Sequence, residues 1–201
     1  MRDCVIIGKP NVGKTLFLIN FAEYIGATAI QFACSPSGAT YETAYSFESA
    51  RAGLVGPKPH MTTSVRPAIL RIRVGKGVRD FYMTDTAGIC EGIHEDATVR
   101  SGMADSLRRL RFCDIVLHMM DASKATATGQ PEAIGDVDLQ IARFAASKLG
   151  YAILANKMDI RGAEAGLVYI RQLFPTSRVI PTSAVSGKGF REVRAFIVSH
   201  L

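Results

Sequence analysis

The stretch GKPNVGKT, at residues 8–15, decides how the chain folds around it. It follows an apolar run at residues 3–8 and precedes a segment with helical spacing of apolar residues at 14–25. A strand, a loop of the form G-x-x-x-x-G-K-[ST] and a helix, in this order, are typical of a loop that binds phosphate groups. The glycines let successive backbone N–H groups point at an anion, and the helix N-terminus adds the positive end of its dipole.

Two side chains of this loop are expected to carry its chemistry. Lys14 should reach the β- and γ-phosphates of a nucleotide, and the Thr15 hydroxyl should coordinate Mg2+. The loop residues predicted to bind the nucleotide are Gly8, Asn11, Val12, Gly13, Lys14 and Thr15.

Apolar runs and segments of helical period alternate along the rest of the chain. Further strands are predicted at 64–74, 79–84, 114–121, 151–156 and 178–181, and further helices at 98–112, 137–149, 163–173 and 190–201. The first two of these strands flank a turn at 75–77, and this hairpin supplies one antiparallel strand. Because helices separate the other strands, the predicted fold is α/β, with a mostly parallel six-stranded sheet and helices on both faces.

Residues 27–60 do not fit this alternation. A structureless loop longer than about 12–15 residues is uncommon in a compact domain, so we predict an insertion between the first helix and the second strand. Within it, residues 28–34 are a candidate strand, and residues 39–52 have helical spacing. We found no repeat, low-complexity tract or linker, and we therefore expect residues 1–201 to form a single domain.

Composition limits the cellular location and the kinds of partner that the sequence suggests. The chain has 201 residues, a net charge of +6 and a pI of about 9.3. No apolar run approaches the roughly 18–20 residues that span a bilayer, and the start is too short for a signal peptide, so we expect a cytoplasmic protein without a transmembrane segment. The positive charge suits an anionic partner such as RNA, the ribosome or a membrane surface, and it equally suits a plain solvated surface.

A second motif, DTAG at residues 85–88, ends the second strand of the hairpin. Strand ends in an open α/β sheet face the ligand. The Asp85 carboxylate can therefore hold Mg2+, usually through water, and the Gly88 amide can sense the γ-phosphate. DTAG alone is a weak signal, but it is a strong one after a phosphate-binding loop.

A third motif, NKMD at residues 156–159, follows a predicted strand. Guanine presents two donors, N1–H and the 2-amino group, and the Asp159 carboxylate can accept from both. Adenine lacks this pair, so such a site discriminates by about 10⁴-fold or more. Lys157 can cover the base, and Asn156 can tie this loop to the phosphate loop. After the last strand, Ser183 and Ala184 are expected to bind the base, with the Ala184 N–H donating to guanine O6.

Taken in order, GKPNVGKT, DTAG, NKMD and SAVSGKG resemble the guanine-nucleotide-binding motifs of the translation-factor-related P-loop GTPases. They are most similar to those of the Era-like branch, which includes the tRNA-modification GTPase MnmE and the G domain of the ferrous-iron transporter. The resemblance covers most of the chain outside residues 27–60 and implies a P-loop NTPase G-domain that binds GTP and GDP. The motif set is specific for the nucleotide and not for a cellular role.

The resemblance also implies a switch I threonine that closes on Mg2+ when the γ-phosphate is bound. Thr62 and Thr63 are the candidates, and Thr63 is preferred because residues 62–66 resemble the family's Thr-Thr-Arg pattern with the arginine displaced. The residues expected to take part in catalysis are Lys14, Asn11, Thr63, Asp85 and Gly88. The expected Mg2+ ligands are Thr15, Thr63 and Asp85.

Ile89 follows the DTAG motif, where Ras-type enzymes have a glutamine that orients the attacking water. An isoleucine cannot do this, so we expect slow hydrolysis. Asn11 occupies the loop position that holds K+ in potassium-activated relatives, or it only stabilises the loop. The segment after Gly88, called switch II below, offers other candidates for positioning water: Glu91, His94, Glu95 and Asp96.

Two functions stay open at this point. The first is a GTPase switch whose nucleotide state controls binding to a larger assembly, with ribosome or RNA work as the leading candidate. The alternative, favoured by Ile89, is a non-catalytic guanine-nucleotide-binding or scaffold module, for example in transport regulation. Potassium-activated relatives pair across their switches, which implies a nucleotide-dependent homodimer as a further hypothesis.

Overall fold

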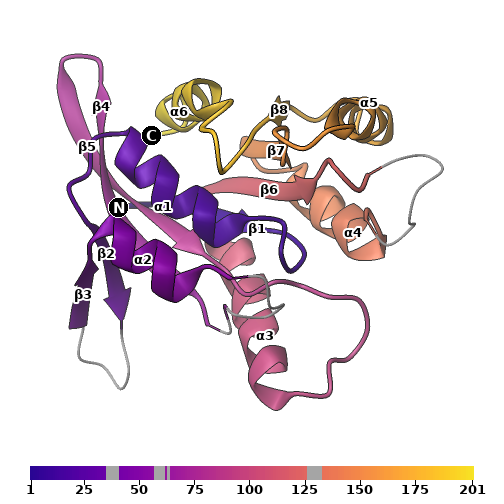
Figure 1. The fold of residues 1–201 in the computed structure, drawn as a ribbon, viewed down its shortest axis with the longest axis horizontal. Coiled ribbons are helices and arrows are strands. Elements are labelled where there is room, and N and C mark those ends of the chain that lie inside the picture. The colour runs from indigo at the N-terminus through magenta and orange to yellow at the C-terminus, as the bar shows by residue number, and fades with distance from the viewer. Residues whose placement is uncertain (35–40, 57–61, 63, 126–132) are drawn as a thin grey trace.

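The computed structural model describes residues 1–34, 41–56, 62, 64–125 and 133–201 (Figure 1). Within these residues the strands are β1 (Arg2–Ile7), β2 (Ile30–Cys34), β3 (Tyr41–Tyr45), β4 (Arg66–Val74), β5 (Gly77–Asp85), β6 (Ile115–Asp121), β7 (Gly150–Asn156) and β8 (Val179–Pro181). The helices are α1 (Lys14–Tyr24), α2 (Phe47–Leu54), α3 (Ala97–Phe112), α4 (Asp136–Ala145), α5 (Ala163–Leu173) and α6 (Phe190–Val198).

The strands form one sheet in the order β3-β2-β4-β5-β1-β6-β7-β8. β1 pairs in parallel with β5 and β6, and parallel pairing continues through β7 to β8. β4 is antiparallel to β5, as the predicted hairpin requires. The α/β class and the mostly parallel sheet are confirmed. The six predicted strands are present, and the insertion adds β2 and β3, so the described sheet has eight strands rather than six.

The insertion builds one edge of this sheet. The predicted strand at 28–34 is confirmed as β2, which is antiparallel to β4. The predicted helix at 39–52 is wrong in its first half, because Tyr41–Tyr45 forms β3 and pairs with β2. Tyrosine and threonine favour a strand once a partner strand is present. Helix α2 begins after Ser46, whose Oγ caps it by accepting from the Ser49 N–H at 3.1 Å.

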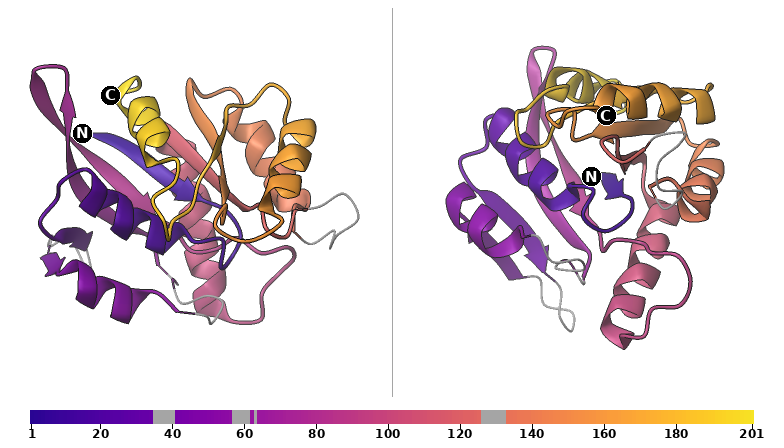
Figure 2. Two further views of the ribbon diagram at one scale, coloured as in Figure 1. Left: turned by 45° about the horizontal axis from the view of Figure 1, so that its top comes forward. Right: turned by 45° about the vertical axis from the view of Figure 1, so that its right-hand side comes forward.

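Alternate residues of the central strands point into two separate cores. In β1, Cys4 and Ile6 belong to one apolar cluster and Val5 and Ile7 to the other, because successive side chains of a strand point to opposite faces. The first cluster includes residues of α1, α2 and α6, and the second includes residues of α3, α4 and α5. Helices therefore cover both faces, as Figure 2 shows for α1 and α2 on one side and α3 and α4 on the other.

Aromatic rings join the first helix to the last one. Phe190, at the start of α6, lies edge-on to Phe17 and Phe21 of α1, with ring centroids 5.1 and 5.5 Å apart. Tyr24 makes a third edge contact with Phe190 at 5.5 Å. Phe190 is only 2% exposed, so these buried ring contacts hold α6 against α1.

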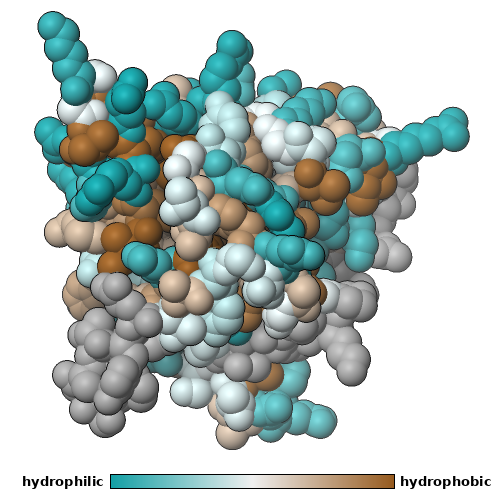
Figure 3. Space-filling model, turned by 60° about the vertical axis from the view of Figure 1, so that its left-hand side comes forward, coloured by the Kyte–Doolittle hydropathy of each residue, from teal (hydrophilic) through white to brown (hydrophobic). Residues whose placement is uncertain are grey.

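The surface around the β4–β5 hairpin is mixed in character. Hydrophilic side chains project from this side of the molecule, with apolar areas between them (Figure 3). Arg71 and Asp80 pair across the two strands at 2.7 Å, but an exposed pair of this kind contributes little to stability. Of the helices that the structure describes, none has the length and apolar character needed to cross a bilayer.

Replacing Phe190 by alanine should lower the free energy of unfolding by about 3–5 kcal/mol, because a buried ring is lost and a cavity remains. Urea denaturation followed by circular dichroism measures this change. Leu149→Ala is the control, since Leu149 is 94% exposed and its loss should change stability by less than about 0.5 kcal/mol. Equal small effects at both positions would contradict the packing role of Phe190.

Candidate functional site

Most of the expected site residues lie at the carboxyl ends of four neighbouring strands, and Ser183 and Ala184 follow a fifth, β8. β1 ends at Ile7, directly before the glycine-rich loop, and β5 ends at Asp85. β6 and β7 end at Asp121 and Asn156, which lie opposite each other in the register. Because these strands are parallel, their ends meet at one edge of the sheet.

The loop at residues 8–15 wraps tightly because three of its residues have a positive φ. Gly8, Asn11 and Gly13 have φ values of 151°, 60° and 105°. Asparagine adopts the left-handed region at lower cost than most residues, which accounts for Asn11. A Cβ on Gly13 would lie 2.5 Å from Asn156 Nδ2, so glycine is also required there by close packing.

Lys14 is buried at the start of α1, with its ammonium group inside the loop. Its Nζ donates to the carbonyl oxygens of Gly8 and Lys9, at 3.1 and 2.7 Å. Desolvation lowers the pKa of Lys14 to about 8, although the charges of Asp85 and Asp138 act in the opposite direction. A cation in so dry a place attracts an anion more strongly than a solvated lysine does.

A cluster of side-chain oxygens surrounds Thr15. Its Oγ1 donates to Asp85 Oδ2 at 2.7 Å and lies 3.0 Å from Thr62 Oγ1. Desolvation raises the pKa of Asp85, against the hydrogen bond from Thr15 and the charge of Lys14. Asp85 Oδ1 is buried and has no hydrogen-bond partner among the described residues. A buried carboxylate oxygen of this kind beside two hydroxyls suits a hard cation such as Mg2+.

Of the two switch I candidates, the structure describes only Thr62. This residue is 9% exposed, and its Oγ1 lies 3.5 Å from Asp85 Oδ2. Thr63, the preferred candidate, lies outside the described residues, so its role stays a prediction.

The buried side chain of Asn156 joins three loops. Its Nδ2 donates to the Val12 carbonyl at 2.8 Å, and its Oδ1 accepts from the Ala184 N–H at 2.9 Å and from Thr182 Oγ1 at 3.3 Å. The phosphate loop, the NKMD loop and the loop after β8 are thereby held together. The Ala184 N–H, the expected donor to guanine O6, has a partner inside the protein here, and its contact with a base stays a prediction.

The other base-recognition residues are also held by short contacts. Asp159 Oδ1 accepts from Ser183 Oγ at 2.6 Å, which orients the carboxylate. Lys157 has a φ of 68° and pairs with Asp121 at 2.6 Å. These contacts fix where the NKMD loop presents its side chains.

The phosphate loop, Thr15, Thr62 and Lys157 face one pocket of about 430 Å³. Gly88 lines this pocket and packs closely on the loop, because a Cβ there would lie 2.7 Å from Pro10 Cα. The pocket also has walls that the sequence analysis missed. They are Lys124 after β6, and Leu54, Val55 and Gly56 at the end of the insertion helix. None of these four residues belongs to a sequence motif, and only the folded chain brings them to the pocket.

Switch II turns away from the pocket after Gly88. Ile89 is 4% exposed, packs in the second apolar cluster and donates its N–H to the Gly8 carbonyl at 3.2 Å. Asp96 caps α3 by accepting from the Thr98 N–H at 2.7 Å. None of the four polar candidates in this segment is among the described residues that line the pocket.

A family model described as 50S ribosome-binding GTPase matches residues 44–157, more than half of the chain. Among curated proteins, the chain is similar to GTPase Obg from Akkermansia muciniphila, with 25% identity over 196 residues. The match covers 96% of this chain and 47% of that relative, so the chain spans about half of the relative's length.

Two solved structures of Era resemble the fold. A variant of Aquifex aeolicus Era bound to GDP and aluminium fluoride has a TM-score of 0.70 and 22% identity, over 100% of this chain and 57% of that chain. Era in complex with MgGDPNP and a segment of 16S ribosomal RNA has a TM-score of 0.69 and 21% identity, over 100% of this chain and 56% of that chain. At these identities the likeness concerns the fold alone.

Stability of the ligand-free chain should rise with pH in the window set by Lys14. The pKa of Lys14 is about 8 in the folded chain and 10.5 as its ordinary value, so the unfolded state holds more protons between these limits. The free energy of unfolding should gain up to about 1.4 kcal/mol per pH unit from this residue. Chemical denaturation of the wild type and Lys14→Met across the window measures the gain as their difference. Parallel curves would contradict it.

Proposed function

The chain belongs to the 50S ribosome-binding GTPase family, and from this premise we propose that it binds GTP and GDP with Mg2+ and acts as a nucleotide-dependent switch. In this proposal it also hydrolyses GTP slowly to GDP and phosphate. The observation that carries the proposal is the junction at Asn156, which brings the phosphate loop and the base-recognition loop together. An anion-binding loop joined in this way to an oriented carboxylate matches both ends of a guanine nucleotide.

At the phosphate end, Lys14 and the N–H groups of the loop would bind the β- and γ-phosphates. Thr15 and Asp85 would hold Mg2+, together with Thr63 or its described neighbour Thr62. The partnerless Asp85 Oδ1 supports this assignment. Bound Mg2+ supplies neutralisation of the phosphate charge. The Gly88 amide, held against the loop, would sense the γ-phosphate.

At the base end, Asp159 would accept from guanine N1–H and the 2-amino group. Its hydrogen bond from Ser183 supports this role, because the bond restrains the carboxylate before a ligand arrives. Lys157 would lie over the base, since it lines the same pocket. Adenine would leave the Asp159 carboxylate without donors.

Hydrolysis would be slow because Ile89 is apolar and packed in the core. In the proposed mechanism Asn11 contributes to a K+ site beside the phosphates, where the cation's charge would stabilise the transition state. Asn11 lines the pocket, and its left-handed backbone holds the side chain at the loop's turn, which supports this role.

The proposed partner of the switch is the ribosome or its RNA, in the cytoplasm. The family description names the 50S ribosome, and the net charge of +6 suits a polyanion. One of the structural relatives is an Era protein in complex with 16S ribosomal RNA.

Replacing Asp159 by asparagine should move binding from guanosine toward xanthosine nucleotides, because the amide offers a donor to the xanthine carbonyl and loses one acceptor for guanine. Titration of the wild type and Asp159→Asn with labelled GDP and XDP measures the change, and we expect at least about a hundredfold loss for GDP. Asp105→Asn, on α3 with its side chain 45% exposed, is the matched control. Unchanged selectivity would remove Asp159 from the base site.

GTP turnover with Mg2+ should be about tenfold or more faster in K+ than in Na+ if Asn11 helps to hold the cation. Phosphate release measures the rates. Asn11→Gly should abolish the difference, because glycine tolerates the φ of 60° and lacks only the amide group.

Near-zero rates in both salts, despite tight GTP binding, would instead favour a non-catalytic guanine-nucleotide-binding module. If GTP turnover is as fast in Na+ as in K+, and Asn11→Gly does not change it, the K+ site is excluded. ATP is the specificity control in both salts.

A further inference from the structure

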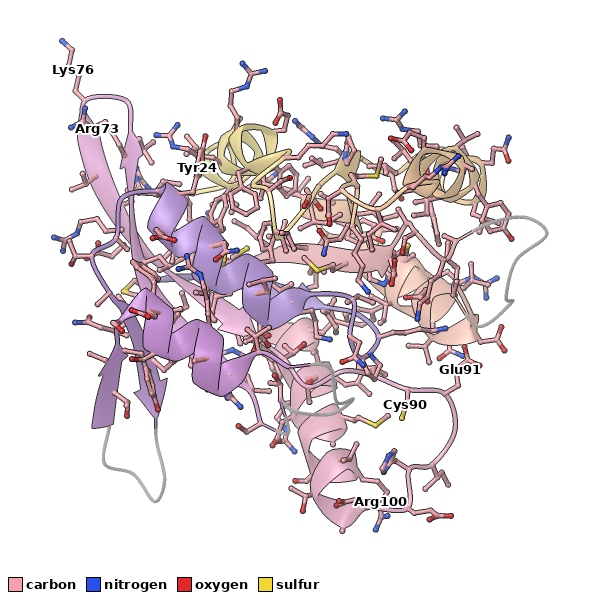
Figure 4. The ribbon with its side chains drawn as sticks, viewed as in Figure 1. Tyr24, Arg73, Lys76, Cys90, Glu91 and Arg100 are labelled. Carbon is pink, nitrogen blue, oxygen red and sulfur yellow. The ribbon has the colours of Figure 1, made fainter. Side chains whose placement is uncertain are left out.

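Switch II is tied to the phosphate loop by a side-chain contact outside the nucleotide pocket. Lys9 Nζ of the loop donates to Glu91 Oε1 at 3.1 Å. Two residues earlier, the Ile89 N–H donates to the Gly8 carbonyl. The start of switch II is therefore held to the start of the loop through both backbone and side chain. Figure 4 shows Cys90 and Glu91 in this segment, with Arg100 further along it on α3.

Lys9 is itself held from the opposite side by α4. Its Nζ lies 3.5 Å from Asp138 Oδ2, and the Asp138 side chain is only 2% exposed. Asp138 also accepts from the Gly135 N–H at 3.2 Å and lies 3.1 Å from His118 Nε2. A buried carboxylate is costly without a compensating cation, so Asp138 keeps the Lys9 ammonium group in place. Glu91 then binds to an ammonium group that is already oriented.

Gly135 provides the space for this arrangement. A Cβ at Gly135 would overlap the Glu91 carboxylate and lie 2.9 Å from Lys9 Nζ. The Glu91 carboxylate thus occupies the space that the side chain of any residue larger than glycine at position 135 would need. Its position depends on α4 as well as on Lys9.

The remainder of switch II makes looser contacts. Gly92 has a φ of 72° and open space around it, and Ile93 is 90% exposed. The far end is fixed again by Arg100, whose Nη1 donates to the His94 and Glu95 carbonyls at 2.7 Å. Switch II is thus held at its start by the Glu91 contact and at its end by Arg100. The Glu91 contact restrains the residues that directly follow Gly88.

We propose that Lys9 and Glu91 form a latch that holds switch II closed on the phosphate loop and so positions Gly88 for the γ-phosphate. Lys9 is the positioning residue and Glu91 is its anchor, with Asp138 and Gly135 as their support. Neither Lys9 nor Glu91 is among the described residues lining the pocket, so the latch acts on switch II and not directly on the ligand. The role in hydrolysis rests on the proposed function, whereas the latch itself does not.

Cys90 is a built-in reporter of the latch. It precedes Glu91, is partly buried, and its Sγ lies 3.5 Å from Met103 Sδ. Cys4 and Cys113 are buried, and burial raises the pKa of both thiols, so they react slowly. In a Cys34→Ser background, the rate of reaction with a thiol reagent therefore measures how often switch II opens.

Lys9→Met and Glu91→Gln should each raise the Cys90 labelling rate about two- to fivefold, the range expected when a partly exposed ion pair is lost. The double variant should label no faster than Lys9→Met alone, because that variant has already lost the contact with Glu91. Lys9→Arg, which keeps the positive charge, should label at the wild-type rate. Gly135→Ala should also raise it, since the new methyl group displaces Glu91 while both charges remain. Lys76→Met, on the hairpin tip far from switch II (Figure 4), is the matched control.

Measurements of GTP turnover test whether the latch affects the proposed reaction, separately from whether the latch exists. Lys9→Met should lower kcat for GTP severalfold while KM and the affinity for GDP stay within about twofold, and Lys9→Arg should recover kcat. Unchanged labelling in Lys9→Met, additive effects in the double variant, or an equal rise in Lys76→Met would overturn the latch. Faster labelling with unchanged kcat would overturn its positioning role. If the wild type shows no turnover, the proposed hydrolysis fails and labelling alone decides the latch.

Discussion

The buried amide of Asn156 holds three loops together, and the rest of the site depends on this contact. Its nitrogen donates to Val12 and its oxygen accepts from Ala184, so one side chain satisfies backbone groups of two loops that are far apart in the chain. Losing it would leave those buried groups unpaired. The absence of a Cβ at Gly13 lets the amide approach the phosphate loop, which links the backbone of the loop to the position of the base-recognition segment.

Two lysines of one loop make different contacts. Lys14 is buried inside the loop, where desolvation lowers its pKa to about 8 and its Nζ donates to the Gly8 and Lys9 carbonyl oxygens. Lys9, whose side chain is 14% exposed, pairs with the carboxylates of Asp138 and Glu91. Only a few residues separate the two lysines in the chain. A shift of the loop around a ligand at Lys14 would therefore also move Lys9 and its contact with switch II. The loop is thus both a binding element and a connection between the sheet edge and α4.

The sequence predicted best where a local pattern and a motif coincide. The strand, loop and helix around residues 8–15, and the strand ends at Asp85 and Asn156, follow from apolar period and residue type. Helical spacing at 39–52 was misleading, because pairing with β2 makes the first part a strand. The motifs resembled those of the Era-like GTPases, which agrees with the matching family model and with the similarity of the chain to an Obg GTPase. Thr63 stays a prediction.

By itself, the sequence determined the α/β fold class and the presence of a guanine-nucleotide motif set, since these depend on local backbone needs and on residue types at strand ends. Only the tertiary structure decided that the end of the insertion helix walls the pocket, that Ile89 is buried, and that Glu91 meets Lys9 over Gly135. These contacts join residues far apart in the chain. Their formation depends on how helices and strands pack in layers, and no local pattern of residues encodes that packing.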